Sequence, residues 1–183
     1  MSGYIKLFWG FLFLFDFRIQ GFDILPDIVS YLFFYFGSVE LAYENKKFNK
    51  AKEYAITLVF LSILNIYQVQ VKIEYFSFSL FNSLQMLIGT AVFILDLLMV
   101  YYIIAGIVEI AKEAGENKLV DTANGRWRLY LVTGITVYLG GIFAFIIPQI
   151  ILFFVIPLLI LNIIALVLMM SLMLQAHRSL YNG

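Results

Sequence analysis

Long apolar runs separated by short polar stretches set the pattern of this chain. Six runs are candidates for membrane-crossing helices, at residues 4–19, 24–42, 54–71, 80–111, 129–147 and 150–175. A helix rises about 1.5 Å per residue, so a bilayer core of about 30 Å takes roughly 20 apolar residues. The sequence therefore predicts an all-α, polytopic membrane bundle of about six helices, arranged as three tandem hairpins in a single domain. Because the first run is short, a re-entrant half-helix is the alternative for it.

The polar stretch between the first two runs carries three carboxylates and one guanidinium, on Asp16, Arg18, Asp23 and Asp27. We expect it to form the external tip of the first hairpin, with Asp23 as the N-cap of the second helix. We also expect Arg18 within salt-bridge reach of Asp23 or Asp27, because unpaired charges near lipid are costly. Capping and pairing are the simplest roles of these residues, and binding of a cation or an external partner is the alternative.

Helix-breaking residues predict the later turns. Gly115 and the pair Asn124–Gly125 indicate a polar loop over residues 112–128. Pro148 predicts the turn between the last two runs, and Pro157 predicts a kink inside the final run.

The composition indicates that lipid surrounds most of the molecule. Hydrophobic residues make up 63% of the 183 residues and charged residues 13%, whereas soluble domains carry roughly 45–50% and about 25%. The formal net charge of zero gives no general attraction to nucleic acid. The chain has no cysteine and one histidine, His177, so disulfides and thiolate chemistry are excluded and a histidine-rich metal site is not expected. We expect no cofactor and no metal.

Basic residues are distributed unequally between the two sides of this topology. Two of them, Arg18 and Lys72, fall on one side and ten on the other. The ten are Lys6, Lys46, Lys47, Lys50, Lys52, Lys112, Lys118, Arg126, Arg128 and Arg178. Because Lys and Arg concentrate on the cytoplasmic side, this asymmetry predicts six spans with both termini in the cytoplasm.

A short internal echo joins the second and fourth runs. Residues 37–42 read GSVELA and residues 106–111 read GIVEIA, and each is followed by an Asn-Lys pair. Duplication of a helical hairpin explains the echo, and chance in a biased composition is the alternative.

The residues of the first hairpin tip, DFRI at 16–19 and GFDILPD at 21–27, carry a family resemblance. Together with the lysine-rich loop, Asn65-Ile66-Tyr67 and Arg126-Trp127 with Tyr130, they resemble a group of small, uncharacterised multi-pass membrane proteins of low-GC Gram-positive bacteria. The resemblance covers most of the chain. It implies a multi-pass protein of the bacterial cytoplasmic membrane and implies no particular activity.

Asp96 is the residue that most directly suggests a function, because it lies in the middle of the fourth run. A charge at mid-bilayer costs about 2.5–3.5 kcal/mol or more, so this carboxyl needs a hydrogen-bond partner or a proton. Asn65 and Asn162 fall at similar depth in the third and sixth runs, so the three side chains are expected to converge. A proton, ion or solute site is one interpretation, and a polar contact that fixes helix packing is the other.

Sequence motifs of common enzymes are absent: there is no GxSxG, HExxH, P-loop or dinucleotide fingerprint. We therefore expect no enzymatic activity. A small transporter or channel-like protein with its site at Asp96 is the first hypothesis for function. A non-transporting membrane subunit, acting in assembly, sensing or immunity through its loops and helix packing, is the alternative. The expected partners are the lipid bilayer and a second copy of the chain or another membrane protein.

Overall fold

The computed structural model describes residues 2–15, 18–19, 22–23, 27–65, 80–146 and 148–181. Over these residues the chain forms six helices and one pair of two-residue strands, which confirms the all-helical fold class. The elements in order are α1 (Gly3–Phe13), β1 (Arg18–Ile19), β2 (Phe22–Asp23), α2 (Asp27–Leu41), α3 (Lys47–Asn65), α4 (Leu80–Glu113), α5 (Asn117–Ile146) and α6 (Pro148–Tyr181).

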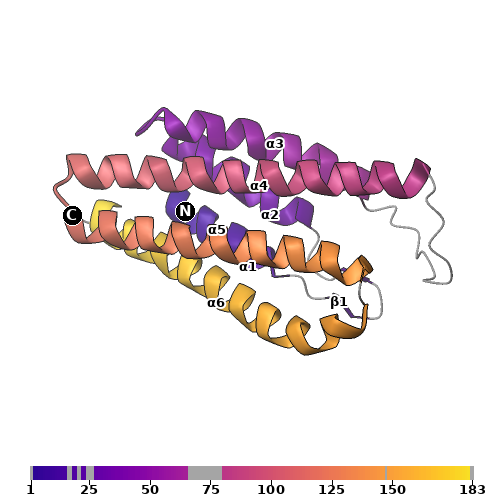
Figure 1. Cartoon of the computed structure of the whole chain (residues 1–183). Coiled ribbons are helices and arrows are strands. Elements are labelled where there is room, and N and C mark those ends of the chain that lie inside the picture. Colours follow the sequence, from indigo (N-terminus) through magenta and orange to yellow (C-terminus); the bar gives the residue numbers. More distant parts are fainter. Residues whose placement is uncertain are drawn as a thin grey trace.

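The six helices pack as a closed ring. Each helix packs against the next one in the chain, and α6 returns to pack against α1 (Figure 1). The two ends of the chain meet there, since a hydrogen bond of 3.0 Å joins Ser2 Oγ to His177 Nδ1. The order agrees with three tandem hairpins, α1–α2, α3–α4 and α5–α6.

The helices differ greatly in length. α1 and α2 have 11 and 15 residues, or about 16 and 22 Å at 1.5 Å per residue, whereas α4 and α6 have 34 residues each, or about 51 Å. In Figure 1, α4, α5 and α6 run on past α1, and α6 diverges from α4 toward the end away from the termini. The three long helices α4, α5 and α6 therefore extend beyond α1 at the end away from the termini (Figure 1).

The buried core lies toward the end that carries the termini. Side chains such as Leu7, Phe34, Ile103, Leu119 and Met169 are no more than 1% exposed. By contrast, apolar side chains are exposed along the remaining length of α5 and α6. They include Val132, Ile135, Leu139, Phe154, Ile156, Leu159, Ile160, Ile163, Ile164 and Val167. Exposed apolar faces of this extent are typical of contact with lipid or with another protein.

Two segments of the described chain are long and apolar enough to cross a bilayer: Met86–Glu113 in α4 and Ile156–Leu180 in α6. The helix α1 is apolar but shorter than a span needs. The structure thus agrees with membrane association and leaves the count of six spans as a prediction.

The sequence echo corresponds to two equivalent helix contacts. A Cβ added at Gly37 of α2 would lie 2.8 Å from Leu7 Cδ2 of α1, and one added at Gly106 of α4 would lie 2.6 Å from Phe48 Cε2 of α3. At both positions a glycine therefore lets a large apolar side chain of the preceding helix sit directly on the backbone.

The glutamates of the echo also make equivalent contacts. Glu40 pairs with Lys6, the residue before Leu7, and Glu109 pairs with Lys47, the residue before Phe48, at 3.4 Å. Asn45 Nδ2 also donates to Glu109 Oε2 at 2.8 Å. A Lys–apolar pair on one helix thus meets a Gly-x-x-Glu on the next, twice, which favours duplication of a hairpin over chance similarity.

The expected ends of the first two helices were wrong. The helix α1 ends at Phe13 rather than at residue 19, because the chain turns and Arg18–Ile19 pair with Phe22–Asp23 as antiparallel strands. Asp23 lies in β2 and is not the N-cap of α2, which begins at Asp27. A strand pair at this point satisfies backbone groups that a helix end would have left unpaired.

The expected loop over residues 112–128 was also wrong. Residues 114–116 connect α4 to α5, with Gly115 at φ 75° as the turn residue, so the stop signal at Gly115 is confirmed. Asn124–Gly125 lies inside α5. An internal glycine costs a helix only about 1 kcal/mol, and buried Leu119 and Ala123 hold this polar extension against the bundle.

The other boundaries shifted for a similar reason. The helix α3 begins at Lys47, not at residue 54, because Phe48, Ala51 and Ala55 bury one face of its charged first half. At the last turn, Pro148 is the first residue of α6, where a missing N–H costs little. Pro157 lies within this helix, as expected.

Candidate functional site

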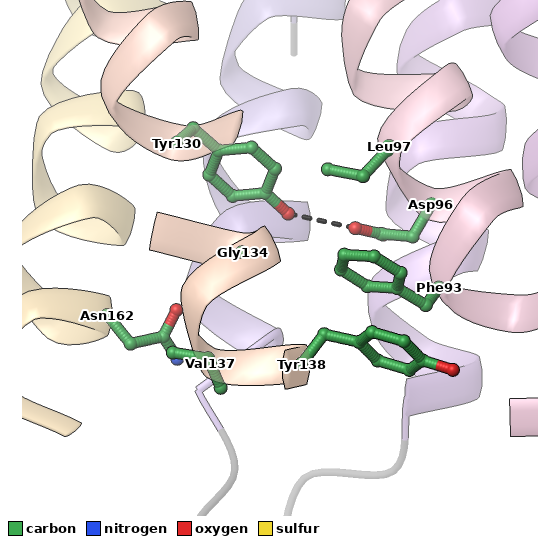
Figure 2. A pocket seen from close by; sticks show the side chains of 8 residues that line it. All are labelled: Phe93, Asp96, Leu97, Tyr130, Gly134, Val137, Tyr138 and Asn162. Atoms are coloured by element: carbon green, nitrogen blue, oxygen red, sulfur yellow. Dashed lines mark hydrogen bonds between the residues drawn. The ribbon is translucent and has the colours of Figure 1, made fainter. Parts of the chain in front are cut away.

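Asp96 lies near the middle of α4 and faces α5. Tyr130 of α5 donates its hydroxyl hydrogen to Asp96 Oδ2 at 2.9 Å (Figure 2). The other carboxyl oxygen, Oδ1, is buried and has no hydrogen-bond partner among the residues that the structure describes. The hydrogen bond from Tyr130 fixes the carboxyl group of Asp96, and its second oxygen, Oδ1, remains an acceptor without a described donor.

A cavity of about 230 Å³, partly open to its surroundings, has Asp96 in its wall. Side chains and backbone of three helices line it: Phe93, Asp96 and Leu97 from α4, Tyr130, Gly134, Val137 and Tyr138 from α5, and Asn162 from α6. Figure 2 shows Asn162 extending from α6 toward Val137 on the far side of α5 from α4. The cavity therefore has mostly apolar and aromatic walls, with a carboxyl group, an amide and two phenol groups among its lining residues.

Aromatic contacts support the α4–α5 wall of the cavity. Phe93 and Tyr138 are stacked, with ring centroids 4.3 Å apart and planes 4° from parallel, and the Tyr138 hydroxyl is hydrogen-bonded to Thr90. On the other side, Tyr130 stacks on Trp127 at 6.3 Å. Stacked rings have few conformations, so this wall is preorganised.

Gly134 explains why space is present. A Cβ at Gly134 would meet Phe93 Cε2 at 3.6 Å and Leu97 Cδ2 at 3.7 Å, which are ordinary contact distances. An alanine would therefore fit without displacement, and a larger residue would extend into the cavity. The missing side chain at this position contributes to the open volume.

No cation balances Asp96 within the described part of the chain. The ion pairs found there, Lys6–Glu40, Lys47–Glu109 and Lys50–Glu53, do not include it. The groups of α2 close enough to act on it electrostatically are Asp27 and Tyr31, neither of which is basic. The site can therefore accept a hydrogen-bond donor, a proton or a positive charge.

Arg126 is the basic residue of α5 one turn before Tyr130, and it is engaged elsewhere. Its Nη1 donates to the backbone carbonyl of Leu168 in α6 at 2.9 Å. Burial lowers the pKa of the Arg126 guanidinium, but arginine stays charged in proteins. Arg126 thus links α5 to α6 and does not reach the carboxyl group of Asp96.

The structure brings two of the three expected midplane residues, Asp96 and Asn162, to the same cavity. Asn65 is the last residue of α3, and its side chain lies outside the described part of the structure. Tyr130 was missing from the expected site. Tyr130 lies next to the predicted start of the fifth run, and a tyrosine at such a place is typical of a membrane interface. In the structure α5 begins earlier, at Asn117, and the side chain of Tyr130 is buried.

The residues of the hairpin tip are described less fully. Asp16 lies outside the described residues. The strand register places Arg18 opposite Asp23. The structure describes the backbone of these two residues and not their side chains, so the expected ion pair stays a prediction. Asp27 begins α2 and is exposed. Over the described residues no group of three His, Cys, Asp or Glu side chains is arranged to hold a metal ion.

Comparison of the chain with protein-family models, with curated proteins and with solved structures gave no match. The resemblance to Gram-positive membrane proteins stays a prediction, and the site is interpreted from its own chemistry.

Proposed function

We propose that this chain is a six-span integral membrane protein that binds a small solute or ion at Asp96 and moves it across the bilayer as a small transporter or channel-like protein. The exposed apolar faces of α4 and α6 support a membrane location. The contact between Ser2 and His177 puts both termini at one end of the bundle, as an even number of spans requires. The basic side chains at that end support a cytoplasmic orientation.

The observation that carries the proposal is the position of Asp96, a carboxyl residue near the middle of α4, in the wall of a cavity between α4, α5 and α6. One of its oxygens, Oδ1, is buried and has no partner among the described residues, and an unpaired buried acceptor costs about 1–3 kcal/mol. A ligand or a proton that reaches this carboxyl group would remove that cost.

The position of the cavity suits a transport site. Asp96 and Asn162 each lie near the middle of a helix that is long and apolar enough to cross a bilayer, α4 and α6. These two side chains therefore lie well inside the spans, whereas Tyr130 lies at the start of the apolar part of α5. Ionisable residues at this depth mark ion and solute pathways in membrane proteins. Alternating access then requires a second conformation, because side chains such as Ile103, Ile107 and Met169 close the end that carries the termini.

That closed end is the observation that favours the second candidate, a non-transporting membrane subunit. A protein with this role needs no continuous path and no second conformation. The two candidates differ in one measurable property, which is flux through the purified protein.

The test is flux in reconstituted vesicles. We expect the purified protein to carry a pH-dependent proton, ion or solute flux that Asp96→Asn abolishes while folding is kept, because the amide retains hydrogen-bonding capacity but does not titrate. Asp121→Asn is the matched control, since Asp121 is an exposed carboxylate on α5. Equal flux in wild type and Asp96→Asn would overturn the site, and absence of flux in the wild type would favour the second candidate.

A further inference from the structure

The walls of the Asp96 cavity restrict the kind of ligand that fits. Two polar groups from opposite sides, the carboxyl group of Asp96 and the amide of Asn162, are set among Phe93, Leu97, Val137 and the rings of two tyrosines. A dehydrated inorganic cation needs a shell of oxygen ligands, for example six to eight for Ca²⁺. An apolar wall with one open carboxylate oxygen does not provide such a shell.

The same walls suit an organic cation. The carboxyl group of Asp96 is part of the wall, and Oδ1 lacks a hydrogen-bond partner among the described residues. A charge-assisted hydrogen bond from an ammonium group to a carboxylate is about twice as strong as a neutral one. Phe93 and Tyr138, whose rings are stacked on each other, both line the cavity, and aromatic rings attract cations within about 6 Å of the ring centroid. The apolar remainder of the ligand would contact Leu97 and Val137.

The free volume gives a scale for the part of the ligand that the cavity takes up. It is about 230 Å³, and the cavity is partly open to its surroundings. By comparison, an enclosed apolar cavity of about 150 Å³ holds a benzene molecule, and pockets for drug-sized ligands begin at about 300 Å³. The cavity therefore has room for the ammonium group and one small apolar or aromatic group.

We infer that the Asp96 cavity binds a small monovalent organic ammonium ion, with the carboxylate of Asp96 as its counter-ion and the stacked pair Phe93–Tyr138 as the aromatic part of its wall. The inference rests on the proposed function and specifies the ligand of that same cavity. In this role Tyr130 is a positioning residue, because its hydroxyl group holds Asp96 Oδ2 at 2.9 Å and so fixes the carboxyl group.

The test compares two probes of nearly equal shape, 2-phenylethylammonium and the neutral alcohol 2-phenylethanol, by titration calorimetry on the purified full chain in detergent. We expect the wild type to bind the ammonium ion at least about tenfold more tightly than the alcohol. Asp96→Asn should remove this preference and leave the alcohol affinity unchanged. Phe93→Leu should weaken ammonium binding by about threefold to tenfold, and Asp121→Asn should change nothing.

Two further variants keep the test decisive if Asp96→Asn does not fold. Gly134→Leu should fill the cavity and abolish binding of both probes, whereas Gly134→Ala should bind as the wild type does, since its Cβ makes only ordinary contacts. Equal affinity of the wild type for the two probes would overturn the ammonium ligand and leave a solute site in place. Asp96-dependent flux without binding of either probe would overturn it in favour of an inorganic ion or proton. Absence of both binding and flux would overturn the proposed function as well.

Discussion

Removal of the Tyr130 hydroxyl is the most direct test of the polar centre. Tyr130 is 9% exposed, and its bond of 2.9 Å to Asp96 Oδ2 is the hydrogen bond that the described chain gives this carboxyl group. Since Oδ1 is already unpartnered, Tyr130→Phe leaves the whole carboxyl group without a partner. A buried acceptor that loses its partner costs about 1–3 kcal/mol in soluble proteins, and polar couplings within membranes average about 0.6 kcal/mol. We expect a loss of about 1 kcal/mol in the free energy of unfolding, which is the lower limit of the first range and lies above the second value.

A double-mutant cycle separates this bond from the packing of the ring. Asp96→Leu alone leaves the Tyr130 hydroxyl unpartnered, whereas the double variant with Tyr130→Phe removes both polar groups. We therefore expect the double variant to be more stable than the sum of the two single losses predicts. The measurement is unfolding in sodium dodecyl sulfate mixtures, followed by the circular dichroism of the helices. Tyr101→Phe is the control, since Tyr101 is 45% exposed. Single changes that add within about 0.3 kcal/mol would refute the interaction.

Three further predictions follow from the contacts. Gly37→Ala should lower the free energy of unfolding by about 1–3 kcal/mol, because the added Cβ would meet Leu7 Cδ2 at 2.8 Å. Gly141→Ala should be neutral or stabilising, because its Cβ would meet nothing within 4 Å. Equal effects of the two changes in the same unfolding assay would contradict the close packing at Gly37. Glu40→Gln should cost less than about 1 kcal/mol, and less again in high salt, because the pair with Lys6 is partly exposed; a salt-independent loss would contradict this. Tags on either terminus should be accessible from the cytoplasm alone, and an external C-terminus would exclude six spans.

The six helices could be predicted from the sequence, and so could the start of α4 at Leu80 and the end of α2 within one residue, whereas several other ends could not. Apolar runs identify the lipid-facing or core-facing part of each helix, and each of the six runs contains part of one helix of the structure. A helix need not end where its apolar run ends. The helix α5 begins 12 residues before the run, at Asn117, because buried side chains at wide spacing hold a polar extension that mean hydropathy does not detect. The short α1 ends early because a strand pair follows it.

The site was predictable in part for a related reason. Asp96 and Asn162 could be placed together because polar residues at equal depth in apolar helices converge on the bundle interior. Tyr130 could not be found in this way, because tyrosine occurs at membrane interfaces as well as in cores, and only the true start of α5 distinguishes the two. The space beside Gly134 depends on how α4 and α5 are rotated toward each other, which a hydropathy pattern does not specify.

The two ends of the bundle differ in a way that relates packing to function. At the end that carries the termini, the repeated glycine contacts of α2 and α4 bring large side chains onto the backbone, and the core there is closed. The third hairpin, α5–α6, has no Gly-x-x-Glu in α6, and it contributes Gly134, Tyr130 and Asn162 to the cavity instead. The buried core at the end with the termini is separate from the Asp96 cavity, so the cost of an unpaired oxygen there is set against stability from elsewhere in the bundle. The proposed alternating access would require α5 and α6 to move relative to α4, and this motion would have to separate the Phe93–Tyr138 stack and the Tyr130–Asp96 bond.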